Sequence, residues 1–147
     1  MALGVLFAVG LPAHLTAAPA AATDIQVEQA WVRWLPADLP GAGYMTLINA
    51  GNSNVVLIDV TSPDYDGISI HQTQDEHGTS RMVAVASIAL KPHSTVRFAE
   101  GGYHLMLMRP RRPIQPGDKV SISLHFDKGP AVSVPFDVRA GGTVTPQ

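Results

Sequence analysis

The chain contains no cysteine, and this absence excludes two kinds of structure. Without cysteine there are no disulfide bonds, so the fold of an exported form must be held by its hydrophobic core alone. There is also no thiolate to bind a metal, which excludes a blue-copper electron-transfer site built on histidine and cysteine. Any soft metal ligand in this sequence must therefore be a methionine, and the chain has five of them.

Charged residues are also scarce, at 15% of 147 residues, whereas 46% of the chain is hydrophobic. This balance fits one compact globular domain and argues against disorder. The net charge of −2 does not indicate nucleic-acid binding, which requires an excess of positive charge. The one basic cluster is Arg109, Arg111 and Arg112. We interpret it as a solvated loop, with a docking patch for an acidic partner as the alternative.

The first 22 residues lack Lys, Arg, Asp and Glu altogether. An apolar run from Ala2 to Leu11 precedes an Ala/Pro-rich stretch that ends at Ala22, a pattern typical of a secretory signal peptide with an A-x-A-like cleavage site. We therefore expect residues 1–22 to be cleaved, after Ala22 or alternatively after Ala18, leaving a soluble periplasmic protein. The apolar run is too short to span a bilayer comfortably. No basic residue precedes it, so either the true start lies upstream or the signal is atypical.

Helical periodicity is hard to find after residue 23, and 13 glycines and 12 prolines separate short apolar segments. This pattern predicts an all-β domain over residues 23–139, built as a single Greek-key β-sandwich or barrel, with a short polar tail at 140–147. We expect a polar hairpin tip at 74–79. Nine strands are expected, at residues 25–34, 42–49, 55–60, 68–72, 82–85, 95–98, 103–108, 120–126 and 132–138.

One stretch, Gly101 to Met108, alternates a histidine and two methionines with leucines. At the strand period of two, His104, Met106 and Met108 share one face, where an imidazole and a thioether can converge on one ion. Thioether sulfur is a soft neutral ligand that favours Cu(I). Taken alone, the stretch also fits a buried strand in which methionine fills gaps and histidine finds a hydrogen bond. We expect Met108 to lie deeper, in the core.

Two upstream residues extend this candidate site. Ten residues separate His71 from Met82, and 21 more separate Met82 from His104, with Met106 two positions beyond. If strands 68–72 and 82–85 pair as a hairpin beside strand 103–108, two imidazoles and two thioethers meet. Four neutral donors of this kind suit Cu(I), which accepts low coordination numbers. Taken alone, His71 is interpreted as an ordinary histidine in a strand, and Met82 is interpreted as a core residue.

The spacing His-x10-Met-x21-His-x-Met, the stretch Gly101 to Leu107 and the later Pro116-Gly117-Asp118 resemble the PCuAC family of periplasmic copper chaperones. The resemblance implies a cupredoxin-like fold and a Cu(I) site. It also implies delivery of copper to the binuclear CuA centre, with the apo CuA domain of cytochrome c oxidase subunit II as partner. The implied Cu(I) ligands are His71, Met82, His104 and Met106.

The chain departs from that family at two places. Many members carry methionine directly after the first histidine, where this chain has Gln72, and some carry a His/Met-rich C-terminal extension that residues 140–147 do not provide. We therefore expect an exported chaperone for one Cu(I) ion, without a second Cu(II) role. The alternatives are a copper storage or resistance protein and a metal-free β-sandwich interaction module. No paired-carboxylate or Ser/His/Asp spacing indicates an enzyme.

Overall fold

The structure is a computed structural model that describes residues 24–37 and 39–141, and in these ranges it contains ten strands and no helix. The expected signal peptide and residues 142–147 lie outside the described residues. Among the described residues, no helix is long and apolar enough to cross a membrane. The strands are β1 (Ile25–Trp34), β2 (Gly41–Asn49), β3 (Val55–Thr61), β4 (Tyr65–Glu76), β5 (Thr79–Ala84), β6 (Ile88–Leu90), β7 (Ser94–Phe98), β8 (Tyr103–Pro110), β9 (Lys119–Phe126) and β10 (Val132–Ala140). The predicted all-β class is confirmed.

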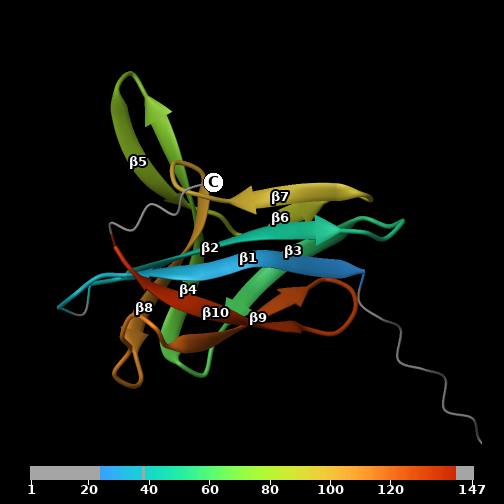
Figure 1. Ribbon diagram of the computed structural model, residues 1–147. Helices are drawn as coiled ribbons and strands as arrows, with labels where there is room; N and C mark the ends of the chain where they lie inside the picture. Colours follow the sequence, from blue (N-terminus) through green and yellow to red (C-terminus); the bar gives the residue numbers. More distant parts are fainter. Residues whose placement is uncertain (1–23, 38, 142–147) are drawn as a thin grey trace, which may run out of the picture.

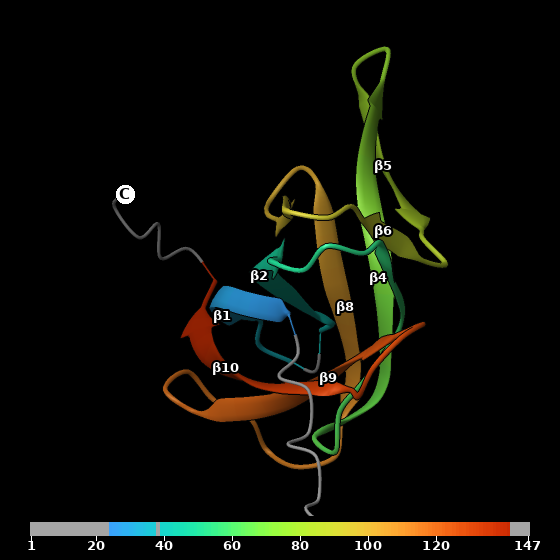
Figure 2. The ribbon, with the colours of Figure 1, turned by 90° about the vertical axis from the view of Figure 1, so that its right-hand side faces the viewer.

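All ten strands join one hydrogen-bonded sheet in the order β5-β4-β8-β7-β2-β1-β10-β9-β3-β6, and β8 also pairs with β2. The sheet curls on itself, so that β3 packs against β4 and β6 against β7. Figures 1 and 2 show the result, with β4 and β8 along one side of the molecule and β9 and β10 crossing it. The barrel-like wrap leaves one concave face for the core and one convex face for solvent.

Alternation of buried and more exposed residues is clearest in β9, and the core follows from it there. In β9 the buried side chains are Val120, Ile122, Leu124 and Phe126, and the residues between them are more exposed. In β8 the core face carries Leu105 and Leu107, at 0% and 1% exposure. Each such side chain contributes about 1.5–3 kcal/mol on burial. Because these leucines take the inner face of β8, its histidine and methionines project from the outer face.

The hairpin of β4 and β5 differs from the expectation. Strand β4 continues to Glu76, which pairs with Thr79, so the predicted six-residue tip contains only two turn residues. These are His77 and Gly78, both at positive φ (52° and 82°), as a type I′ hairpin turn requires. The hairpin projects from the body as an arm (Figure 2). The outer part of the arm has no core to face, so both faces of its strands carry polar residues. The sequence there lacks the alternation of apolar and polar residues by which a strand is predicted. Strand β6 was not predicted.

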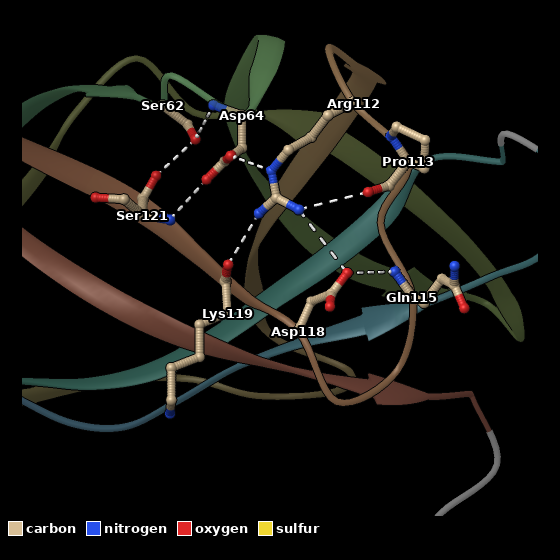
Figure 3. Close-up of polar contacts among 8 residues, drawn as sticks. All are labelled: Ser62, Asp64, Arg112, Pro113, Gln115, Asp118, Lys119 and Ser121. Carbon is tan, nitrogen blue, oxygen red and sulfur yellow. Dashed lines mark hydrogen bonds and ion pairs between the residues drawn. The ribbon is translucent and has the colours of Figure 1, made fainter.

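An arginine-centred network closes the end of the barrel near the β8–β9 loop (Figure 3). Arg112 Nε donates to Asp64 Oδ1 (2.7 Å), while the other Asp64 oxygen accepts the Ser121 N–H (2.9 Å). Arg112 also donates to the Lys119 carbonyl (3.0 Å). Burial raises the pKa of Asp64, but the Ser121 amide and Arg112 outweigh it and lower that pKa overall. The three arginines of the basic cluster are exposed, as expected for a solvated cluster, and Arg111 is also paired, with Asp66.

Candidate metal site

The two histidines of the candidate site lie side by side on neighbouring strands. Strand β4 pairs antiparallel with β8 in a register that sets His71 directly opposite His104. Their ring centroids are 5.8 Å apart, with the ring planes inclined by 42°. Met106 lies opposite Ser69, which is two residues before His71, so both imidazoles and this thioether share the outer face of the sheet.

Met82 joins the same face from the projecting arm. It pairs with Thr73, two residues after His71, so its side chain stands on the histidine side of the hairpin. Met82 is 59% exposed, which contradicts its interpretation as a core residue. A thioether so exposed contributes little to packing, and it lies at the rim of the candidate site where a partner can reach it.

His104 is held in one tautomer by the turn that precedes it. The side chain is 6% exposed, and its Nδ1 lies 3.3 Å from the Gly102 carbonyl oxygen. Because a carbonyl only accepts, Nδ1 carries the hydrogen and Nε2 keeps its lone pair. That Nε2 is buried and has no hydrogen-bond partner among the described residues. A metal ligand held by a hydrogen bond through its other ring nitrogen has this arrangement.

His71 also has one ring nitrogen with a partner and one without, but its partner is a hydroxyl group, which can donate as well as accept and so does not fix the tautomer. Its Nε2 lies 3.0 Å from the Ser69 hydroxyl oxygen, whereas its buried Nδ1 has no hydrogen-bond partner within the described part of the chain. Burial lowers the pKa of His71, and the neighbouring His104 lowers it further. The neutral imidazole, which is the form that binds metal ions, is therefore favoured.

The donor set determines which metal these residues suit. Within the described ranges, no group of three or more His, Cys, Asp or Glu side chains could hold a metal ion. A metal bound between His71 and His104 would need the thioethers of Met82 and Met106 to complete its coordination. Two imidazoles and two thioethers form a soft, neutral set, which fits Cu(I) better than the harder divalent ions.

A hollow of about 360 Å³ opens beside the candidate ligands. Three of them, Met82, His104 and Met106, form part of its wall, and His71 does not. The remaining wall includes Arg33, Tyr44 and Glu100. The sequence interpretation missed these three residues. Arg33 and Tyr44 lie on β1 and β2, which the pairing of Ala42 with both Arg33 and Met106 brings beside β8, and Glu100 lies in the turn that leads into β8.

Two residues of the wall, Arg33 and Tyr44, belong to a stack of aromatic rings and arginines. The Trp31 and Tyr44 rings lie 4.9 Å apart. The Arg33 guanidinium lies 5.8 Å from the Tyr44 ring centroid, and that of Arg139 lies 5.4 Å from the Trp31 ring centroid. A bulge in β1 between Glu28 and Trp31 precedes this pairing with β2. The stack fixes Arg33 beside the candidate ligands.

Two other histidines have hydrogen-bond partners elsewhere in the fold, and Met108 lies on the same face as Met106, further along β8. His93 bonds to Asn52 and His125 to Thr61. Met108 was expected to lie in the core, and this was wrong. It is only partly buried and does not belong to the buried core, because it projects from the outer face of β8 near Gly67, where Leu105 and Leu107 already occupy the inner face.

Comparison with known proteins identifies the family. Residues 25–138 match the family described as "Putative lipoprotein LpqE-like". The chain belongs to this LpqE-like family. A relative from Leifsonia xyli subsp. xyli, "Putative lipoprotein Lxx21020", is 29% identical over 133 residues, which cover 90% of this chain and 80% of the relative.

Two solved structures place this LpqE-like protein among PCuAC domains. The copper-bound PCuAC domain from PmoF2 is 26% identical with a TM-score of 0.67, over 80% of this chain and 93% of that domain. The solution structure of CuI-DR1885 from Deinococcus radiodurans is 25% identical with a TM-score of 0.56, over 88% of this chain and 85% of that one. The resemblance to PCuAC proteins and the cupredoxin-like fold are confirmed.

Proposed function

We propose that this LpqE-like protein is an exported copper chaperone that binds one Cu(I) ion through His71, Met82, His104 and Met106. One observation carries the proposal: two imidazoles face each other across β4 and β8, and each has one buried nitrogen without a hydrogen-bond partner among the described residues. Leaving such nitrogens unpaired costs free energy, about 1–3 kcal/mol each. A metal ion with which both lone pairs bond offsets that cost.

The relatives support the same ligand and compartment. The PmoF2 domain is copper-bound and the DR1885 structure is a Cu(I) form, and both share this fold at 25–26% identity. The family description as lipoproteins supports an exported location. We further propose that the acceptor is the apo CuA domain of cytochrome c oxidase subunit II, with other copper-handling proteins as alternatives.

Transfer would proceed by ligand exchange without a redox step. A donor atom of the acceptor bonds to Cu(I) while a thioether of the chaperone leaves, and copper stays in the +1 state throughout. Met82 is the ligand placed to leave first, because it lies on the exposed arm and its loss disturbs no core packing. Thiolates bind Cu(I) more strongly than thioethers, so transfer to a dithiol acceptor runs downhill.

A Cu(I) competition titration against a colorimetric chelator, under reducing and anaerobic conditions, tests the binding proposal. We expect one equivalent to bind the wild-type chain and none to bind the His104→Ala/Met106→Ala double variant. His125→Ala is the matched control, because this histidine bonds to Thr61 away from the site and its loss should leave binding unchanged. Circular dichroism checks that each variant folds. No competition by the folded wild type would contradict the proposal and favour a metal-free interaction module.

Delivery needs a separate experiment. The copper-loaded chain is mixed with the apo CuA domain of subunit II, the two proteins are separated, and copper is measured in each. We expect copper to move to the CuA domain. Tight binding without transfer would instead indicate a copper storage or resistance protein.

A further inference from the structure

We propose that the hollow beside the copper ligands receives an anionic sulfur donor from the acceptor, which Arg33 attracts and for which Glu100 moves aside. This inference rests on the proposed function, since it concerns how Cu(I) leaves the site. It assigns to Arg33 and Glu100 a role in selecting the class of acceptor, and no role in holding the metal.

The size and position of the hollow indicate that more than a metal ion enters it. At about 360 Å³ it lies within the range of small-molecule sites, roughly 300–1,000 Å³. A single ion between two imidazoles needs only a small part of this space. Met82, His104 and Met106 line the hollow, so a group that enters it lies directly against the metal ligands. A side chain of an incoming protein fits both the space and the position.

The charge in the hollow comes from a guanidinium that is held in place. Arg33 lies against the Tyr44 ring, which is itself only 5% exposed and packed on Trp31. The Nε of Arg33 is buried and has no hydrogen-bond partner among the residues that the structure describes. Arg33 therefore brings to the wall of the hollow a positive charge that its packing on Tyr44 holds in place. This charge favours an anion as the entering group.

Glu100 is the present partner of Arg33 and the more exposed of the two. Its Oε1 accepts a hydrogen bond from Arg33 Nη1 at 2.8 Å, and its side chain is 65% exposed against 34% for Arg33. Exposed ion pairs of this kind contribute little to stability. An entering anion can thus replace the Glu100 carboxylate on Arg33 at small cost, whereas a neutral donor gains nothing from doing so.

The donor that fits this chemistry is a thiolate. Four neutral ligands leave the full +1 charge on Cu(I), and Arg33 adds a second positive charge beside it, so a negative sulfur is attracted by both. In the exchange step, a lone pair of the thiolate forms a Cu–S bond and the bond from copper to the Met82 thioether breaks. The copper stays Cu(I), and the thiol proton has already passed to solvent.

Stopped-flow transfer from the copper-loaded chain to two acceptors of different charge tests the inference. Dithiothreitol at mildly alkaline pH supplies a thiolate, and neocuproine supplies neutral nitrogen donors. With dithiothreitol we expect Arg33→Gln to slow transfer about three- to tenfold and Glu100→Gln to accelerate it. With neocuproine both variants should stay within about twofold of wild type, and added salt should shrink the dithiothreitol effect.

The controls separate charge from structure. Lys91→Gln removes the same charge from a residue that does not line the hollow, and it should leave both rates unchanged. Arg33→Lys should restore most of the dithiothreitol rate. Equal slowing of both acceptors by Arg33→Gln would overturn the inference, and so would unchanged rates in both variants. Failure of the proposed function looks different: the wild-type chain would then bind no Cu(I) in the competition titration.

Discussion

The Gly102 carbonyl oxygen accepts two hydrogen bonds, one from His104 Nδ1 (3.3 Å) and one from the backbone N–H of Thr73 (3.1 Å). The first bond fixes the tautomer of His104, and the second ties the β7–β8 turn to β4, the strand that carries His71. The turn closes with a bond from the Gly102 N–H to the Ala99 carbonyl (3.0 Å). The backbone of a tight turn therefore sets the position of one proposed copper ligand relative to the other.

Replacing a glycine of this turn should weaken copper binding without touching a ligand. Gly101 has a φ of 79°, and a Cβ built there meets nothing within 4 Å, so Gly101→Ala introduces backbone strain alone. We expect a loss of about 1 kcal/mol in the free energy of unfolding and a weaker Cu(I) affinity. Urea unfolding and chelator competition measure the two effects.

Gly129 provides the matched control for that change. It has a φ of 80° and equally open surroundings, but it lies in the β9–β10 connection, away from the site. Gly129→Ala should cost about the same stability and leave Cu(I) affinity at the wild-type value. If both variants lower the affinity equally, the turn has no specific role in positioning His104.

Met82→Ala should separate function from stability. Because Met82 is 59% exposed, its removal leaves no cavity, and we expect the free energy of unfolding to stay within about 0.5 kcal/mol of wild type. If its thioether binds copper, Cu(I) affinity should fall clearly. The control is Ile58→Ala, because Ile58 is 49% exposed. This variant should change the free energy of unfolding equally little and leave the Cu(I) affinity at the wild-type value. An unchanged affinity for Met82→Ala would remove this residue from the proposed ligand set.

The sequence predicts strands well where one face meets the core and poorly elsewhere. Strand β9 shows its alternation in full, and nearly all of it was predicted. The arm of β4 and β5 was predicted too short, because its outer residues face solvent on both sides and carry no apolar period. Strand β6 has three residues, Ile88 to Leu90, too few to establish a period.

The candidate site, like the fold, could be predicted from the sequence only in part. We expected the four candidate ligands to meet if strands 68–72 and 82–85 pair as a hairpin beside strand 103–108, and β4 does pair with both β5 and β8. The part of the wall formed by Arg33 and Tyr44 could not be predicted, because these residues reach the site only through the β1–β2 and β2–β8 pairings. No local pattern marks such residues, since their proximity is a property of the sheet order.

The Arg112 network should make stability depend on pH through Asp64. The folded-state pKa of Asp64 lies below its unfolded value of 3.8, so its carboxylate stabilises the fold above pH 3.8. This contribution is lost as the pH falls through the lower, folded-state pKa. Asp64→Asn removes the charge-assisted bond to Arg112 and should lower the free energy of unfolding at pH 7 by about 1–3 kcal/mol. Urea unfolding at pH 7 and at about pH 3 should show the difference in stability between Asp64→Asn and wild type shrinking in acid.

The control is Asp66→Asn, because the ion pair of Asp66 with Arg111 is half-exposed. This variant should change the free energy of unfolding by under about 1 kcal/mol at either pH. An equal effect of the two variants at pH 7 would show that the lower exposure of the Asp64 carboxylate adds nothing to its bond with Arg112.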